Sequence, residues 1–236
     1  IEPRARRLGE QILASFPDEP VHLIGHSMGG LDARMVLSDP AWSRRVLSLT
    51  TIGTPHLGSS IADFAQLKVG RVYRFLSALR IDHRGFLDVT RRNARAFHEA
   101  VAPPEGVPCF SIAGNPTIDD VSWPLHRLYL ALSELEGPND GLVSVESALA
   151  FGTPLPHWPV DHLRQTNWLP EPEAKGTTSP IEFYAQAITN LARLGFEAGD
   201  GVEPLAARLP SPSPSPASAI DGTSTPGDPG VFQLLE

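Results

Sequence analysis

The sequence predicts a single α/β domain built on a mostly parallel sheet with helices on its flanks. The chain has 236 residues, which is long enough for one large domain with a sizeable core. Its 41% apolar and 19% charged residues are typical of a globular protein. Helix-like and strand-like segments alternate between residues 2 and 58, as expected where crossover helices join parallel strands.

Four segments establish this alternation. Residues 2–16 carry apolar side chains at helical spacing, with arginines elsewhere on the same segment. Residues 21–24 form a short apolar run that predicts a strand, and a helix over residues 30–37 follows it. This helix ends before Asp39-Pro40, because proline disfavours its continuation. Residues 46–52 then predict the next strand.

Between residues 60 and 107 the pattern becomes mainly helical, which predicts a helical, lid-like insertion. Its apolar stripe of Val72, Phe75, Leu76 and Leu79 either gates a lipid pocket or packs on the core as an ordinary helix. The remaining expected elements are helices over 89–101, 128–135 and 179–196, a strand over 108–113, and short strand or loop segments around 142–145.

The composition changes at about residue 199. The last segment is rich in proline and serine, most of all in Pro210–Pro216, and it contains few large apolar side chains. Such a segment buries too little surface to offset the entropy lost on ordering. We therefore expect an α/β domain over residues 1–198 and a disordered tail over residues 199–236.

Charge and cysteine content narrow the possible partners. The net charge of −8 and the absence of a basic stripe argue against nucleic acid as the main partner. Cys109 is the single cysteine, so no intrachain disulfide is possible, and its apolar neighbours predict an inert core thiol. No run of residues approaches the roughly 18 apolar residues of a transmembrane segment.

The motif that carries chemistry is Gly25-His26-Ser27-Met28-Gly29, which matches the pattern Gly-x-Ser-x-Gly. It lies between a predicted strand and a predicted helix, as the nucleophile elbow of an α/β-hydrolase fold does. We expect Ser27 to be the nucleophile on a strained turn, with both glycines leaving room for close backbone approach. The N–H of Met28, at the start of the helix, is the candidate donor to an oxyanion.

A serine nucleophile needs a base, and the base needs an acid that orients it. In the α/β-hydrolase fold the chain order is serine, acid, then histidine. That order excludes His22 as the base, because His22 precedes Ser27. It also disfavours His26, which belongs to the glycine motif itself. Among later residues the best acid is Asp140 and the best base is His162, although a simple turn and a solvated histidine remain equally good explanations of the pattern alone.

Four blocks together resemble the bacterial triacylglycerol lipases of the Pseudomonas and Burkholderia type, and they occur in that family's order. They are Ile24–Leu31, Thr50–Ser60, Asn139–Val143 and Asp161–Leu163. The resemblance implies that Ser27 is the nucleophile, Asp140 the acid, His162 the base and Met28 an oxyanion-hole donor. In Thr50–Ser60, we interpret His56 as a structural histidine of the loop.

Two departures from this resemblance follow. Family members bind a calcium ion near the triad histidine, but here Arg164 stands where the family has an aspartate, and an arginine would repel Ca²⁺. We therefore expect no calcium site. A guanidinium that meets a carboxylate of Asp119 or Asp120 would bridge the same loops, with solvated surface charges as the alternative.

The second departure concerns the other oxyanion donor, which this fold takes from a loop after an earlier strand. The first twenty residues are mostly one helix and offer no such loop. We expect at least one strand–helix–strand unit, roughly 30 residues, to be missing from the N-terminal side.

Taken together, these features predict a serine hydrolase that cleaves carboxylic esters through an acyl-enzyme and needs no organic cofactor. The expected partners are a lipid or small ester substrate and possible contact with a lipid interface, without nucleic acid or a transmembrane segment. An acyltransferase or phospholipase with the same triad is one alternative. A non-catalytic binding protein that kept the fold is another.

Overall fold

A computed structural model describes residues 1–66, 83–166 and 180–193 of the chain. The apolar stripe predicted at Val72–Leu79 and the tail predicted at 199–236 lie outside the described residues. Among the described helices, none combines the length and apolar character needed to cross a membrane.

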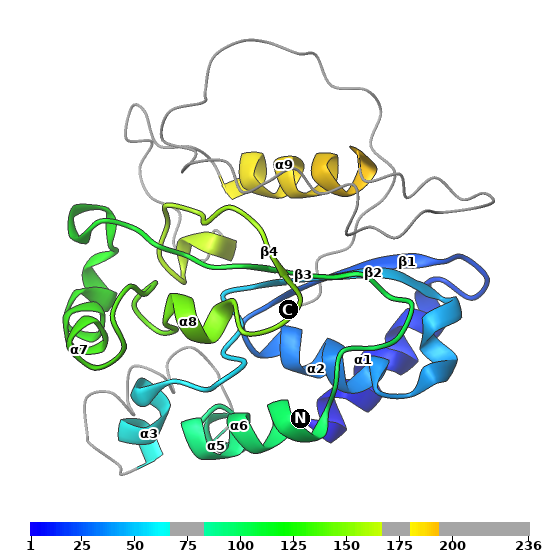
Figure 1. Cartoon of the computed structure of the whole chain (residues 1–236), viewed down its shortest axis with the longest axis horizontal. Helices are drawn as coiled ribbons and strands as arrows, with labels where there is room; N and C mark the ends of the chain where they lie inside the picture. The colour runs from blue at the N-terminus through cyan, green and yellow to red at the C-terminus, as the bar shows by residue number, and fades with distance from the viewer. Residues whose placement is uncertain (67–82, 167–179, 194–236) are drawn as a thin grey trace.

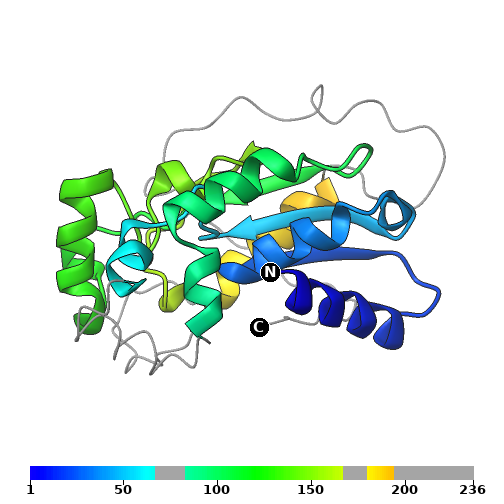
Figure 2. The ribbon, with the colours of Figure 1, turned by 90° about the horizontal axis from the view of Figure 1, so that it is seen from below.

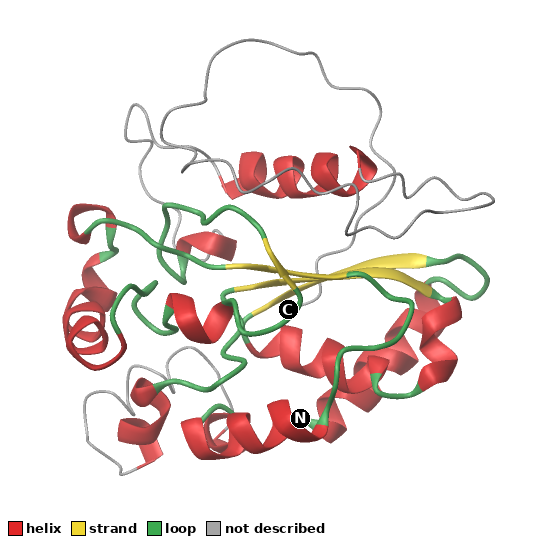
Figure 3. Cartoon of the chain, viewed as in Figure 1, coloured by secondary structure: helices red, strands yellow, loops and turns green. Residues whose placement is uncertain are grey.

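A parallel sheet forms the centre of the domain. Its four strands, in spatial order, are β1 (Val21–His26), β2 (Val46–Ile52), β3 (Cys109–Ile112) and β4 (Thr153–Pro154). Since all neighbours run parallel, the carboxyl ends of the strands meet at one edge of the sheet, where ligands of such sheets bind. Figure 3 shows the strands between helical layers, so the predicted α/β class is correct.

Helices cover both faces of the sheet (Figure 1). On one face lie α1 (Glu2–Ser15) and α2 (Met28–Leu37), whose Ile12 and Ala33 share a core with Leu23 and Leu49 of the strands. Figure 2, seen from the side of these two helices, shows them next to each other. On the other face lies α9 (Pro180–Arg193), which packs Phe183 and Ala187 against β2 and β3.

The remaining elements are short. The other α-helices are α3 (Ser60–Gln66), α5 (His83–Asp88), α6 (Arg91–Ala100), α7 (His126–Glu136) and α8 (Val145–Ala148). The 3-10 helices are η1 (Pro40–Arg44), η2 (Ile118–Asp120), η3 (Trp123–Leu125) and η4 (Arg164–Thr166).

One expected helix starts later in the structure than the sequence predicts. The helix expected over 89–101 starts only at Arg91, because Thr90 has extended backbone angles (φ −61°, ψ 146°) and caps α6. The segment expected as short strand or loop around 142–145 is a loop with an isolated bridge between Asn139 and Ser144, and α8 begins at Val145. The two-residue strand β4 had no prediction, since so short a strand leaves no apolar pattern.

The turn from β1 into α2 is tight, with Ser27 alone between strand and helix. A side chain at Gly25 would lie 2.8 Å from the Cα of Gly30, and one at Gly30 would lie 2.2 Å from Oγ1 of the buried Thr54. A side chain at Gly29 would meet no atom within 4 Å. The expectation of close approach is therefore right for Gly25 and wrong for Gly29, because Gly30 is the second glycine in contact.

Alanine substitutions at Gly25 and Gly29 test whether the first position is closely packed and the second is open. Gly25→Ala should lower the free energy of unfolding by about 1–3 kcal/mol, because the new methyl group overlaps the backbone of α2. The matched control Gly29→Ala, on the same turn, should leave that energy unchanged or raise it by up to about 1 kcal/mol. Urea unfolding measures both, and equal losses in the two variants would contradict this packing.

Candidate active site

Ser27 occupies a strained position at the carboxyl edge of the sheet. Its backbone angles are φ 52° and ψ −126°, and it is the one non-glycine residue with positive φ in the described parts of the chain. Positive φ is costly for a side-chain-bearing residue and is maintained only where its surroundings enforce it. Here the Ser27 N–H donates to the carbonyl of Ile52 (2.9 Å), which holds the turn against the end of β2.

His162 meets Ser27 from the segment after β4. The distance between His162 Nε2 and Ser27 Oγ is 3.0 Å, and that between His162 Nδ1 and Asp140 Oδ2 is 2.8 Å. Because an ionised carboxylate only accepts hydrogen bonds, Nδ1 carries the proton and Nε2 is free to accept from the serine hydroxyl. The His162 backbone N–H also donates to the Asp140 carbonyl (2.9 Å), so the two loops are joined through backbone as well.

Asp140 is a buried carboxylate in the loop before α8, with 1% of its surface exposed. Its Oδ1 accepts from the N–H groups of Leu142 (3.0 Å) and Val143 (2.8 Å). Burial is the largest influence on its pKa and acts to raise it. The charge and hydrogen bond of His162, together with the two backbone N–H groups, outweigh burial and lower the pKa of Asp140 below its usual value.

Met28 is the first residue of α2, directly after Ser27. The N–H groups in the first turn of a helix have no intrahelical acceptor, and they lie at the positive end of the helix dipole. The Met28 N–H is one of the N–H groups in the first turn of α2.

Sequence patterns did not identify one residue that contacts Asp140. Gln165 is fully buried, and its Nε2 donates to Asp140 Oδ2 (2.9 Å) while its Oε1 lies 3.1 Å from Nε2 of His26. A lone glutamine carries no local pattern. The one available signal was its position three residues after His162.

The histidines outside the candidate triad have other environments. His22 lies at the opposite end of β1 and contacts Ser48. His56 is fully buried between Thr51 (Nε2 to Oγ1, 3.0 Å) and Arg34 (Nη1 to Nδ1, 3.1 Å), which agrees with a structural role in its loop. Cys109 is buried, and burial raises the pKa of its thiol to about 12, so the thiol stays protonated.

Arg164 brings a guanidinium to the place where the lipase resemblance implies a calcium ligand. Arg164 Nη1 donates to the backbone carbonyl of Asp120 (2.8 Å), and its Nε lies 3.9 Å from Oδ2 of Asp161. The guanidinium thus joins the two loops. It does so through the backbone carbonyl of Asp120 and not through a carboxylate as expected, because the Asp120 carboxylate accepts from the Thr117 hydroxyl. In the described ranges, no three acidic, histidine or cysteine side chains are grouped so as to hold a metal ion.

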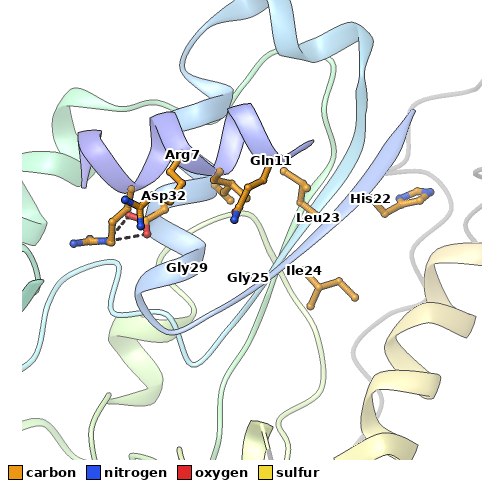
Figure 4. Close-up of a pocket in the computed structure, with 11 residues that line it drawn as sticks. Arg7, Gln11, His22, Leu23, Ile24, Gly25, Gly29 and Asp32 are labelled. Atoms are coloured by element: carbon orange, nitrogen blue, oxygen red, sulfur yellow. Dashed lines mark hydrogen bonds and ion pairs between the residues drawn. The ribbon is translucent and has the colours of Figure 1, made fainter. Parts of the chain in front are cut away.

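A hollow of about 200 Å³ is lined by residues of α1, β1 and α2. Figure 4 shows Arg7, Gln11 and Asp32 around it, with Gly25 and Gly29 on either side of the turn at Ser27. It contains none of Ser27, Asp140 and His162. It does explain why Gly29 has open space beside it.

Comparisons with known proteins agree with this architecture. A family model described as the alpha/beta hydrolase fold matches residues 5–99. The metagenomic carboxyl esterase MGS0156 superposes with a TM-score of 0.64 at 20% identity, covering 79% of this chain and 60% of that one. The lipase BlEst2 of Bacillus licheniformis superposes with a TM-score of 0.53 at 24% identity, covering 67% of this chain and 64% of that one. The chain therefore has the predicted α/β-hydrolase fold.

Sequence relatives agree with the resemblance drawn from the motifs. Triacylglycerol lipase 2 of Saccharomyces cerevisiae is 31% identical over 194 residues, which is 75% of this chain and 58% of that protein. A triacylglycerol lipase of Burkholderia plantarii is 51% identical over 57 residues, which is 24% of this chain and 15% of that protein. The matched region is less than two thirds of the length of either relative. The names of these relatives confirm the predicted resemblance to triacylglycerol lipases.

The histidines of this region make stability depend on pH. Burial, then the neighbouring His162, lowers the pKa of His26 to about 3, and burial, then Arg34, lowers the pKa of His56 well below its usual value. Between those values and about 6.5, only the unfolded chain binds their protons, so the free energy of unfolding should fall as pH drops below about 6.5. Each group contributes up to about 1.4 kcal/mol per pH unit.

Urea unfolding at pH 7 and pH 5 measures this slope. His26→Asn should reduce the slope of the free energy of unfolding against pH by the amount that corresponds to about one bound proton, because that variant has one titrating group fewer. A free energy of unfolding that stays constant from pH 7 to pH 5 would contradict these environments.

Proposed function

We propose that this chain is the catalytic part of a serine hydrolase that cleaves carboxylic esters, with triacylglycerols or related lipid esters as its substrates. The observation that carries the proposal is the continuous line from Ser27 Oγ through His162 to Asp140, with distances of 3.0 and 2.8 Å. The names of its sequence relatives support the substrate class.

In the proposed reaction His162 Nε2 accepts the Ser27 proton as Ser27 Oγ attacks the ester carbonyl. The N–H of Met28 donates to the oxyanion of the tetrahedral intermediate. His162 then gives the proton to the departing alcohol, which leaves an acyl group on Ser27. A water molecule, deprotonated by His162, releases the acid and restores Ser27.

Asp140 stays ionised throughout this cycle. Its carboxylate holds the Nδ1–H tautomer of His162 and stabilises the imidazolium that forms in each half-reaction. Its lowered pKa supports this role, because the carboxylate stays charged over the pH range in which His162 works as a base.

Ser27→Ala should reduce turnover of a short-chain p-nitrophenyl ester by about a million-fold, because no other group takes its place as nucleophile. Initial rates with the purified protein measure this loss. Ser43→Ala, an exposed serine outside the site, is the control and should keep wild-type turnover. Substantial hydrolysis by Ser27→Ala would overturn the assignment.

Asp140→Asn should lower kcat by about ten-thousand-fold while the protein remains folded, because an amide favours the wrong imidazole tautomer. Asp119→Asn replaces an exposed carboxylate on η2 and should leave kcat unchanged. A mild effect at Asp140 with a large one at Asp119 or Asp161 would assign the acid elsewhere.

A further inference from the structure

Gln165 joins two parts of the site that lie far apart in the sequence. Its side chain is fully buried on η4, and it links Asp140 to His26, the residue before Ser27. The ring of His26 also lies 4.6 Å from the ring of His162, centroid to centroid. The glutamine therefore closes a loop of contacts that runs from Ser27 through His162 and Asp140 back to the β1 strand end.

The chemistry of the partners fixes the orientation of the Gln165 amide. Asp140 only accepts hydrogen bonds, so the NH₂ group faces the carboxylate and Oε1 faces His26. Nε2 of His26 must then carry a proton and donate to Oε1. The pKa of His26, lowered to about 3 by burial and by His162, keeps the ring neutral, with this single N–H.

Two glycines leave the space that the amide fills. A side chain at Gly53, just after β2, would lie 2.3 Å from Gln165 Oε1. One at Gly114, just after β3, would lie 2.2 Å from Gln165 Nε2. The absence of a side chain at the ends of both strands thus leaves room for the Gln165 amide.

Gln165 completes the hydrogen bonding of the acid. Oδ1 of Asp140 accepts two backbone N–H groups, and Oδ2 accepts from His162 (2.8 Å) and Gln165 (2.9 Å). Two bonds on each oxygen fix the carboxylate plane and leave Oδ2 pointing at His162. Loss of the Gln165 donor would free one side of Oδ2 and concentrate its charge on His162.

We propose that Gln165 is a positioning residue of the triad, which fixes the Asp140 carboxylate toward His162 and is itself anchored by His26. This inference rests on the proposed function. Gln165 contacts no reacting atom. It acts through Asp140, and its effect should appear in kcat and in the pH profile with little effect on KM.

The charged and titratable groups around this network set the direction of the pH effect. They are Asp140, His26, His162 and, on the neighbouring turn, Asp161 and Arg164. The Asp161 carboxylate is turned away toward the N–H of Ser122 (2.6 Å), and Arg164 lies over it. With the Gln165 donor removed, Asp140 stabilises a protonated His162 more strongly, so the acid limb of kcat/KM should move to higher pH.

The central variants are Gln165→Met, which keeps the volume without donor or acceptor, and Gln165→Glu, which adds a second carboxyl. Gln165→Met should lower kcat about 10- to 100-fold, as expected for one lost hydrogen bond to a charged group. The acid limb of Gln165→Met should lie at higher pH than that of the wild type. In Gln165→Glu the new carboxyl shares one proton with Asp140 and can donate it to Oδ2, so the acid limb should lie closer to that of the wild type. Thr166→Val, exposed on the same turn, should match the wild type.

A second pair of variants tests the anchor. His26→Phe keeps a ring against His162 but has no donor for Oε1, so it should shift kcat and the acid limb in the same direction by a smaller amount. Because both residues act through one contact, the double variant His26→Phe/Gln165→Met should lose less than the product of the two single losses.

Fluorophosphonate titration counts intact sites, so that kcat is expressed per reactive serine and a folding loss is separated from a chemical one. An acid limb in Gln165→Met that stays at the wild-type pH, or a kcat per site equal to that of the wild type, would overturn the positioning role. Failure of the proposed function looks different, since the wild-type protein itself would then show no Ser27-dependent hydrolysis.

Discussion

The site depends on one constraint, the passage from β1 into α2 through the single residue Ser27. The positive φ of Ser27 costs conformational energy, and the close contact of Gly25 with Gly30 together with the Ser27–Ile52 hydrogen bond maintains it. The same turn gives the serine hydroxyl its place above the sheet edge and leaves the Met28 N–H beside it. The proposed nucleophile and the proposed oxyanion donor therefore both come from this one turn.

The buried charge of Asp140 is the second requirement, because a carboxylate with 1% exposure is stable only when its oxygens are paired. Its partners come from its own loop, from His162 and from Gln165. This arrangement explains why the loops after β3 and β4 converge on the end of β2. The pairing that stabilises the charge in the fold also keeps it directed at His162.

Much of this organisation could be predicted from the sequence, because its signals are local. The apolar runs of β1 and β2 and the glycine motif around Ser27 each lie within a few residues. Gln165 could not be found in this way, since 139 residues separate it from His26 and its function depends on the space left by Gly53 and Gly114. The contact at Gly30 was missed for a similar reason, as Thr54 lies on another strand end.

Mapping a fluorophosphonate adduct by mass spectrometry of peptides is the most direct test of the account. Phosphonylation requires a serine activated by its neighbours, so the account predicts one adduct, on Ser27, in the folded protein and none in protein unfolded by urea. An adduct on a different residue, or equal labelling of Ser27 in folded and unfolded protein, would contradict it.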